Sequence, residues 1–387
     1  MNNLKYRYES YGGIIASDNP PLLAHVDKNY MLELGFKKSV LWKSKRKFLT
    51  APLEVHLSVT NKCPLKCRSC YMDSGKALKN ELSTKEIKKV LDMFAQMKVF
   101  HVALGGGESF ARKDFFELAN YARAKGLVPN LTTNGYYINK KTAQKCRVFG
   151  QVNVSIDGIG SDYKKNRGVD FFSRASNAVK LLKEASVPVG INCVISKTNF
   201  NKIESIVRYA GREKLQDIEF LRFKPAGRGK NEYFKMKLDS TQNKKLYPLL
   251  LKLSKKYDIN IKIDCSFVPM LCYHNPPKKD LELFSVYGCE AGNVLVGVEA
   301  DGKMHGCSFL RNNNDSIMNL QKAWDRIENF NNLRTWIARA PDPCSKCSYL
   351  DLCKGGCHAV AEFVTGDLSA PDPECPKVEE KKAKNKE

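Results

Sequence analysis

The sequence lacks the features of a secreted or membrane-spanning chain. Its first residues, MNNLKYRYES, contain neither an apolar signal core nor a small-residue cleavage site. No uncharged apolar run reaches the roughly 18 to 20 residues that a membrane helix requires. The sequence therefore predicts a soluble, cytoplasmic protein in a compartment where thiols stay reduced, with no membrane partner.

Acidic residues are scarce relative to basic ones, with 41 Asp and Glu against 64 Lys and Arg, so the net charge is +23. This excess favours an acidic partner, such as nucleic acid, an anionic peptide or a polycarboxylate small molecule. The lysines are scattered instead of gathered with aromatic residues, and several lie in the terminal KKAKNKE, which we expect to be a solvated tail. Nucleic acid is therefore the least favoured of the three.

Cysteine, in contrast, is abundant, with 14 in 387 residues. The composition is otherwise that of a globular protein, 43% hydrophobic and long enough for two or three domains. Where thiols stay reduced, clustered cysteines bind metal or perform redox chemistry more often than they form disulfides. Cys146 and Cys193 stand alone, and we interpret them as core thiols on a helix and a strand.

Six short β-branched runs alternate with helical patterns, which predicts an α/β fold. One of the helices begins with a capping box, Ser83 and Glu86, ahead of apolar positions at helical spacing, Ile87, Val90, Leu91 and Phe94. Strand-helix alternation implies parallel strands and right-handed crossovers, hence a partial (β/α)6 barrel with its chemistry at the carboxyl ends of the strands. The predicted strands begin near Leu53, Val99, Val128, Gln151, Pro188 and Asp217.

The chain is expected to divide into four parts: an N-terminal segment (1–52), the barrel (53–260), a small cysteine-rich domain (261–376) and a charged tail (377–387). The N-terminal stretch from Tyr11 to Gly35 alternates apolar and polar residues around a DNPP turn, which predicts a hairpin and a short helix. It could be a cap that closes the bottom of the barrel, or an added edge that pairs with an extended peptide.

Chemistry-bearing residues follow four consecutive predicted strands. A CxxxCxxC motif, Cys63, Cys67 and Cys70, follows the first, GGGE ends the second, and TTNG and SIDG end the third and fourth. A structural zinc site needs four ligands, and no histidine lies near the three cysteines to complete it. A [4Fe-4S] cube held by three thiolates keeps one iron open for a ligand. A zinc knuckle is the alternative.

CxxxCxxC after the first strand and GGE after the second resemble the radical S-adenosylmethionine (SAM) enzymes. In that family the open iron chelates SAM, and an electron from the cluster releases a 5′-deoxyadenosyl radical. The resemblance implies that Gly106, Gly107 and Glu108 hold the SAM amine, Asn134 and Ser155 the ribose, and Arg167 the carboxylate. The alternatives without a ligand are that Glu108 is an acidic residue at a helix N-terminus, that Asn134 caps a turn and that Arg167 lies on the surface. The family usually has an aromatic residue before the third cysteine, but here that position is Ser69, and Tyr71 is one residue late.

The C-terminal cysteines resemble the SPASM domain, which carries two auxiliary [4Fe-4S] clusters in many peptide-modifying radical SAM enzymes. The supporting pattern is C-x2-C-x5-C-x3-C, with two cysteines ahead of it and one behind. The resemblance implies one cluster on Cys344, Cys347, Cys353 and Cys375, and another on Cys289, Cys307 and Cys357. A zinc ribbon is the alternative. The three-cysteine set is one ligand short, so we expect an open iron there, or a return of Cys265 or Cys272 on a segment that Pro269 should keep extended.

The resemblance implies three iron-sulfur clusters, bound SAM and net oxidation of a substrate. The expected function is modification of a ribosomal peptide or protein, for example by a thioether or carbon-carbon crosslink, with ferredoxin or flavodoxin as reductant. The alternatives are trimming of a tetrapyrrole side chain on the way to haem, and maturation of an anaerobic sulfatase. A multi-cluster electron-transfer protein is the non-enzymatic alternative. No catalytic acid or base is identified from the sequence.

Overall fold

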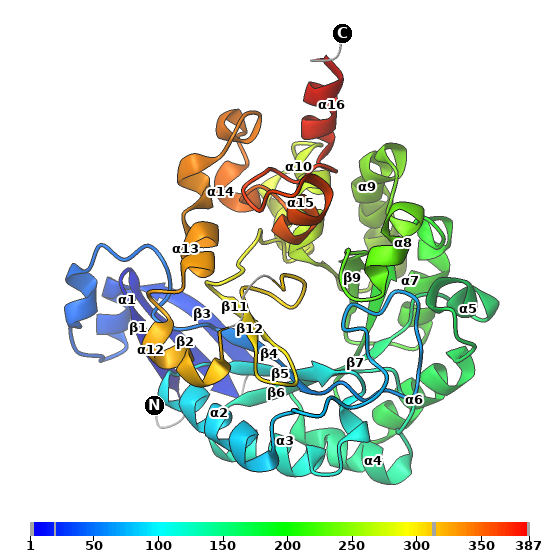
Figure 1. Cartoon of the computed structure of the whole chain (residues 1–387), viewed down its shortest axis with the longest axis horizontal. Helices are drawn as coiled ribbons and strands as arrows, with labels where there is room; N and C mark the ends of the chain where they lie inside the picture. The colour runs from blue at the N-terminus through cyan, green and yellow to red at the C-terminus, as the bar shows by residue number, and fades with distance from the viewer. Residues whose placement is uncertain (1–3, 19–20, 312–314, 385–387) are drawn as a thin grey trace.

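The computed structural model describes residues 4–18, 21–311 and 315–384. Its centre is a curved sheet in the order β10-β9-β8-β7-β6-β5-β4-β11-β12, in which all neighbours are parallel except β11 and β12 (Figure 1). The six predicted strands are all present, which confirms the partial α/β barrel. They are β4 (Glu54–Thr60), β5 (His101–Gly106), β6 (Val128–Thr133), β7 (Val152–Ser155), β8 (Val189–Ile195) and β9 (Ile218–Arg222).

Helices cover the outer face of this sheet as an arc (Figure 1). The predicted capping box forms at Ser83, and Ile87, Val90, Leu91 and Phe94 are buried against the sheet. The helices between β4 and β10 are α2 (Thr84–Gln96), α3 (Phe115–Ala124), α4 (Lys140–Lys145), α5 (Ser161–Arg167), α6 (Phe172–Glu184), α7 (Ile203–Arg212), α8 (Gly229–Met236) and α9 (Ser240–Tyr257).

The strands alternate between buried apolar residues and partly exposed polar ones. In β4, Val55 and Leu57 pack toward the helices, whereas Glu54 and His56 are on the opposite face. Because helices cover only the outer face, these polar positions line the inside of the barrel. Asn153 of β7 and Glu219 of β9 occupy the same kind of position. The barrel interior is therefore a polar lumen and not a second apolar core.

The cysteine-rich region adds strands to both ends of the barrel sheet. The predicted boundary at 260 falls just before β10 (Ile261–Ile263), which pairs with β9, while β11 (Leu295–Val298) pairs with β4 and β12 (Met304–His305) with β11. The remainder is helical: α10 (Val268–Cys272), α11 (Lys278–Leu283), α12 (Leu320–Ala323), α13 (Glu328–Arg334), α14 (Leu350–Cys353), α15 (His358–Thr365) and α16 (Pro376–Lys384). It lies above the barrel mouth (Figure 1).

Two local expectations in this region are wrong. The segment around Pro269 is helical instead of extended, because proline occupies the first turn of α10, where its missing N–H costs nothing. The expected solvated tail forms α16, whose Val378 is buried and whose Glu380 accepts hydrogen bonds from Lys244 and Tyr273. Only residues 385–387 of that tail lie outside the described part of the chain.

The N-terminal segment forms a small antiparallel sheet followed by a helix: β1 (Lys5–Glu9), β2 (Gly12–Asp18), β3 (Pro21–Asp27) and α1 (Lys28–Glu33). The predicted hairpin and short helix are present, whereas β1 was not foreseen; residues 19 and 20 of the predicted turn lie outside the described residues. Ile14 and Ala16 pack against Phe100 and Leu53, immediately before β5 and β4. The sheet thus packs against the amino-terminal ends of β4 and β5. Among the described residues, no helix is both long and apolar enough to cross a membrane.

Candidate functional site

The CxxxCxxC motif forms a loop directly after β4, fixed by backbone hydrogen bonds. Cys63 N–H donates to the Gly75 carbonyl over 2.9 Å, which closes the loop at its base. Arg228 fastens the other side, because its Nε donates to the Cys67 carbonyl over 3.0 Å and its own N–H donates to the Cys70 carbonyl over 2.9 Å. The loop therefore holds its course through main-chain contacts, which leaves the three thiols available as ligands.

The end of β5 approaches the cysteine loop so closely that glycine is required. A Cβ on Gly106, whose φ is +116°, would lie 2.3 Å from the Thr60 carbonyl oxygen, and one on Gly107 would lie 2.4 Å from the Lys62 carbonyl oxygen. Gly107 N–H in turn donates to the Thr60 carbonyl over 2.8 Å. The GGE motif and the CxxxCxxC motif thus form one packed unit, as the resemblance implies.

Glu108 is buried, with 1% of its surface exposed, and both carboxylate oxygens are engaged. Oε1 accepts from the Thr133 hydroxyl over 2.8 Å and Oε2 from the Asn134 N–H over 2.9 Å. Burial raises the pKa of Glu108 to about 7, against the opposing effect of these hydrogen bonds. The carboxylate therefore ties the end of β5 to the end of β6. This is a structural role that the sequence did not indicate, and the assignment to the SAM amine stays a prediction.

Asn134 lies between this carboxylate and the cysteine loop. Its Oδ1 accepts from the Tyr136 N–H over 2.8 Å, which is the turn-capping role, and its Nδ2 donates to Cys63 Sγ over 3.6 Å. Ser155 is half-buried at the end of β7 beside Asn192 of β8. Both residues therefore lie at the carboxyl edge of the sheet, where the ribose assignment places them; the assignment itself stays a prediction.

Arg167 is not a surface residue. It ends α5, its Nη1 donates to the Asp157 carboxylate over 2.9 Å, and its carbonyl accepts from Arg68 N–H within the cysteine loop. The Cys67 thiol is one of its electrostatic neighbours, and its Nε is buried without a hydrogen-bond partner in the described structure. A fixed cation with a spare donor beside a cluster cysteine suits a carboxylate ligand.

Tyr71, the displaced aromatic residue, points to the cysteine-rich region. Its ring lies 5.0 Å from that of Phe309, and burial raises its pKa to about 12. Its carbonyl accepts from Arg311 over 3.0 Å. Tyr71 therefore joins the cysteine loop to the segment that follows Cys307.

The residues around Cys63, Cys67 and Cys70 fit an iron-sulfur cluster. Burial raises the pKa of the Cys63 thiol to about 11, and the other two thiols and Glu108 are among its electrostatic neighbours. Such a thiol becomes a thiolate when the positive charge of a metal offsets the desolvation. Asn134 supplies a hydrogen-bond donor to Cys63, and Arg167 supplies a cation near Cys67.

Cys289, Cys307 and Cys357 meet in a single apolar cluster above the barrel, with Phe223, Leu310 and Val360. Burial raises the pKa of Cys357 to about 11, and Lys224 and Cys307 are among its electrostatic neighbours. Lys224 is itself buried and pairs with Asp264. The structure thus brings together the three cysteines that the resemblance assigns to one auxiliary cluster.

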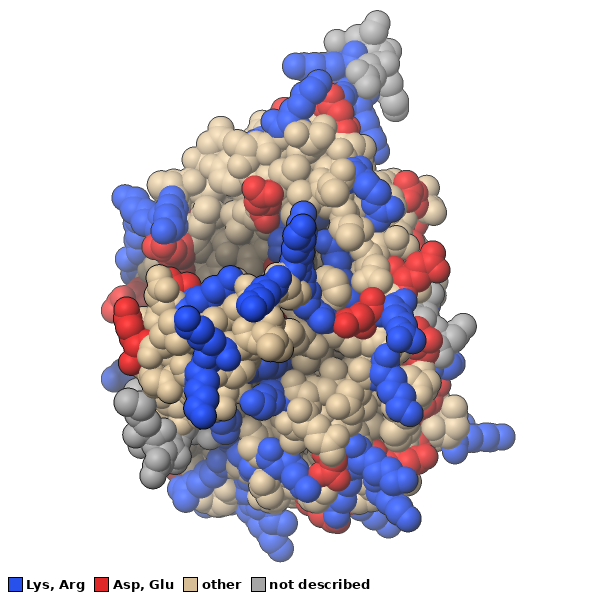
Figure 2. All heavy atoms as spheres, turned by 90° about the vertical axis from the view of Figure 1, so that its left-hand side faces the viewer, with Lys and Arg blue, Asp and Glu red and all other residues tan. Residues whose placement is uncertain are grey.

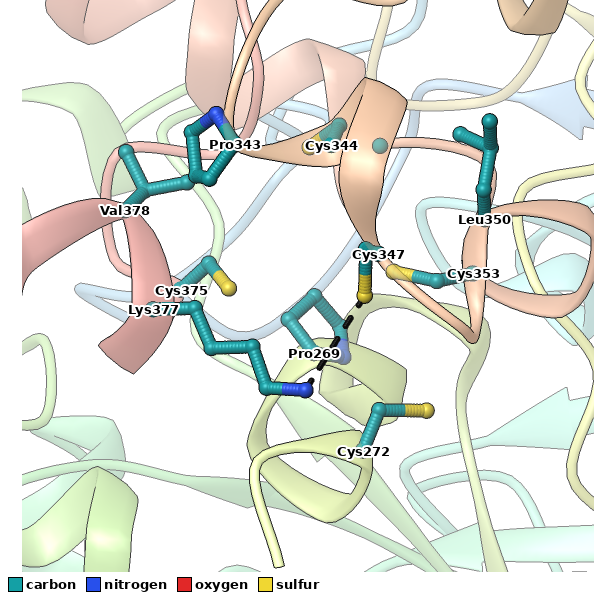
Figure 3. A pocket seen from close by; sticks show the side chains of 11 residues that line it. Pro269, Cys272, Pro343, Cys344, Cys347, Leu350, Cys353, Cys375, Lys377 and Val378 are labelled. Atoms are coloured by element: carbon teal, nitrogen blue, oxygen red, sulfur yellow. Dashed lines mark hydrogen bonds between the residues drawn. The ribbon is translucent and has the colours of Figure 1, made fainter. Parts of the chain in front are cut away.

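The other four predicted ligands line a common cavity (Figure 3). Cys344, Cys347 and Cys353 come from the segment around α14, and Cys375 from the turn before α16. Lys377 Nζ lies 4.0 Å from Cys347 Sγ, where it can donate to a thiolate. Throughout the described residues, no three His, Cys, Asp or Glu side chains converge on a single metal ion; a four-iron cube is bound at separate corners and does not need that convergence.

The barrel lumen contains titratable residues that the sequence did not single out. These residues are Glu54 and His56 of β4 and Glu219 of β9, two strands that lie far apart in the order of the sheet. Burial raises the pKa of Glu219 to about 7, and the nearby acidic groups Asp264 and Glu54 add to this effect. Although burial opposes it, hydrogen bonding with Glu54 raises the pKa of His56. His56 Nδ1 lies 3.2 Å from Ser308 Oγ, next to Cys307. The alternation of polar and apolar residues along each strand could have indicated that these side chains face the lumen. It does not reveal which strands face one another across the lumen.

The sequence profile of the radical SAM superfamily matches residues 57–210, which include the cysteine loop and the GGE motif. The chain belongs to the radical SAM superfamily, and the protein is a radical SAM enzyme. Its fold continues beyond that profile in the manner of the SPASM-containing members.

Particular relatives cover most of the chain. The mycofactocin maturase MftC of Mycolicibacterium smegmatis is 30% identical over 338 residues, which cover 84% of this chain and 83% of the relative. The Fe-coproporphyrin III synthase of Methanosarcina barkeri is 29% identical over 344 residues, which cover 82% of this chain and 86% of the relative. The structure of Streptococcus suis SuiB bound to precursor peptide SuiA superposes with a TM-score of 0.77 at 17% identity, covering 97% of this chain and 99% of that one.

Proposed function

We propose that this enzyme oxidatively modifies a ribosomally made peptide or protein, using SAM and three [4Fe-4S] clusters. The observation that carries the proposal is the gathering of ten cysteines into three groups, one at the barrel mouth and two in the region above it. When bound, the cluster on Cys63, Cys67 and Cys70 together with SAM supplies a radical that abstracts hydrogen from the substrate.

The chain's own residues provide binding and orientation. Arg167 and Asn134 border the cysteine loop at the carboxyl edge of the sheet, where a ligand of the open iron would lie. The lumen beneath it carries His56 and Glu219, which are placed to exchange protons with a substrate that loses hydrogen. Two further clusters above this space suit the removal of an electron from the substrate, so a net oxidation is favoured over a rearrangement.

A peptide is the favoured substrate for two reasons. The relative named a maturase matches this chain over most of its length, and a solved protein of the same fold holds a precursor peptide. Lys and Arg are spread over the face in Figure 2 with Asp and Glu between them, and a hollow opens in the upper part of that face. An acidic leader peptide would suit such a surface, with a small reduced protein such as ferredoxin or flavodoxin as electron donor and the cytoplasm as location.

A tetrapyrrole is the second candidate substrate, because Fe-coproporphyrin III synthase is a relative at nearly the same identity. Propionate side chains would satisfy the same cationic surface as an acidic peptide. Surface charge therefore does not distinguish a peptide substrate from a tetrapyrrole, and an experiment is needed to do so.

The test is incubation of the reconstituted, chemically reduced protein with SAM, first alone and then with candidate substrates. Release of 5′-deoxyadenosine is expected, and its absence would favour the electron-transfer alternative. The peptide substrate is a short peptide encoded beside the gene, and its mass should fall by two hydrogen atoms in a SAM-dependent manner. SAM-dependent formation of iron coproporphyrin III from a sirohaem-type precursor, with no change in the peptide, would overturn the peptide proposal. Maturation of a sulfatase would replace it in the same way.

A further inference from the structure

The first auxiliary site, Cys289, Cys307 and Cys357, has three thiols for four corners, and two unassigned cysteines lie on one segment nearby. Cys265 and Cys272 are separated by less than two helical turns, within the helical stretch that follows β10. A ligand role for either of them rests on the auxiliary clusters of the proposed function. In the structure these two cysteines lie at different sites, Cys265 near Cys289 and Cys357 and Cys272 in the cavity of the other four cysteines.

Cys272 belongs to the other cavity. Its side chain is 3% exposed, and it lines the cavity of Cys344, Cys347, Cys353 and Cys375 as a fifth thiol (Figure 3). Since that site already has four cysteines, Cys272 is not needed there as a ligand. Its electrostatic neighbours Cys347 and Cys375 belong to this cavity, and no cysteine of the first site is among them.

Cys265 lies at the first site. It begins the short 3₁₀ turn Cys265–Phe267 directly after β10, and the residue as a whole is half-buried. Cys289 and Cys357 are both among its electrostatic neighbours, as is Lys224. Cys265 therefore lies near two of the three cysteines that pack together in this cluster.

The turn that carries Cys265 is fastened to the segment that carries Cys357. Arg222 Nη1 donates to the Ser266 carbonyl over 2.9 Å, and the same guanidinium pairs with Asp372. Asp372 Oδ2 also accepts from the Cys357 N–H over 3.0 Å. The Asp264 carboxylate caps the turn by accepting from the Ser266 N–H over 3.0 Å. All of these groups are buried, so the position of Cys265 relative to Cys357 is fixed by the fold.

Lys224 links Cys265 to the other thiols of the site. Its ammonium, held by Asp264, has both Cys265 and Cys357 as electrostatic neighbours, and Cys307 has Lys224 as one of its own. A buried cation facing three thiols offsets the negative charge that a thiolate-bound cluster brings into an apolar site.

We infer that Cys265 is the fourth protein ligand of the first auxiliary cluster, together with Cys289, Cys307 and Cys357, so that no iron of this cluster is open to substrate. This reverses the open iron expected from the sequence. The cluster then serves electron transfer, and the substrate is held by other groups at the lumen.

The test compares three variants of the full-length reconstituted enzyme: Cys265→Ala, the neighbouring control Cys272→Ala, and the reference Cys289→Ala. Cys265→Ala should lose or convert one cluster, so that its iron falls by between about one and four per chain from about twelve, with loss of one electron paramagnetic resonance signal. Cys272→Ala should keep the iron and all signals. A small exogenous thiol should restore the lost signal in Cys265→Ala and leave the unsubstituted enzyme unchanged.

Alkylation of the folded enzyme gives a readout that does not depend on the Cys265→Ala variant folding. With its clusters in place, Cys265 should resist iodoacetamide, and it should become alkylated in Cys289→Ala. Full iron and unchanged spectra in Cys265→Ala, alongside cluster loss in Cys289→Ala, would overturn the inference and leave the auxiliary cluster standing. If Cys289→Ala also keeps its iron, no cluster is bound by Cys289, Cys307 and Cys357. The proposed function would then have to be revised to fewer than three clusters.

Discussion

Glu108 combines a structural role that the sequence did not indicate with the SAM-binding role that the resemblance implies. It accepts hydrogen bonds from Thr133 and Asn134, and Asn134 in turn donates to Cys63. The carboxylate is thus part of the frame of the cluster loop. A negative group in this place is also suited to a ligand ammonium.

Glu108→Gln should weaken SAM binding without loss of iron, because a neutral amide attracts an ammonium less and no metal depends on this residue. The variant should also be less stable by about 1 kcal/mol, since one of its two hydrogen bonds must be rearranged in a buried setting. Equilibrium binding of SAM and thermal unfolding measure the two effects. Unchanged SAM affinity with lowered stability would leave Glu108 with the structural role alone.

Glu219 should make the stability of the protein depend on pH. Burial and nearby acidic groups raise its pKa to about 7 in the folded state, above the ordinary value near 4.5. Between these two values the folded chain keeps a proton that the unfolded chain has lost, so stability falls as pH rises through this window. Glu219→Gln has no such proton to lose.

The variant should therefore gain stability relative to the unsubstituted protein as the pH is raised from about 5 to 8, an interval that spans the raised pKa. Urea denaturation of both proteins at several pH values measures the difference, and comparing the two cancels other titrating groups such as Glu108. A stability difference that does not vary with pH would mean that Glu219 titrates normally.

At the level of elements, the loop after β4 and the end of β5 act as one unit. The glycines of β5 permit contact with the loop, and Arg228 from α8's N-terminal side holds its far edge. The bonds that close the loop at Cys63 and Cys70 are main-chain bonds, and the thiols add only two longer contacts, in which Cys70 Sγ accepts from Ser74 N–H over 3.4 Å and Cys63 Sγ from Asn134 Nδ2 over 3.6 Å. Removing the thiols should therefore spare the fold.

Replacing Cys63, Cys67 and Cys70 together by Ala should remove about four irons per chain and abolish SAM cleavage, while the circular dichroism spectrum is retained. Iron analysis and chromatography of 5′-deoxyadenosine provide the measurements. Cys193→Ala, which removes a buried core thiol, is the control and should keep all iron. Continued production of 5′-deoxyadenosine by the triple variant would show that the radical SAM cluster is elsewhere.

At the scale of the whole molecule, the cysteine-rich region is built into the barrel. It contributes β10 to one end of the sheet and β11 to the other, and the buried Arg222 pairs with Asp372 and Glu374 across the junction. Both C-terminal cysteine groups, which we propose to hold auxiliary clusters, are therefore fixed relative to the lumen. Fixed distances between clusters and substrate favour electron transfer.

Anaerobically reconstituted protein should hold about twelve irons per chain, as three four-iron clusters. Metal analysis and Mössbauer spectroscopy would measure the number and type of clusters. Zinc at the C-terminal cysteines would contradict the assignment, because the zinc-ribbon alternative shares the same paired cysteines. A value near eight irons per chain would show that only one of the two proposed auxiliary clusters is present.

The sequence by itself determined the six central strands, the capping box of α2 and the radical SAM family that CxxxCxxC and GGE indicate. These features depend on residues close together in the chain: apolar periodicity, a Ser-x-x-Glu cap, and thiols spaced to hold a cluster. The buried state of Cys146 and Cys193 followed from the same periodicity.

Only the tertiary structure decided which of these residues meet. The electrostatic influence of Glu54 of β4 on Glu219 of β9 depends on how the barrel curves, and the pairing of β11 with β4 joins distant parts of the chain. The different destinations of Cys265 and Cys272 depend on the turn that Asp264 caps and on the Arg222–Asp372 pair. Local sequence preferences determine which segments form helices and strands and which residue types can act as ligands. Long-range packing determines which of these residues meet, because burial and charge pairing are satisfied only once the whole chain has folded.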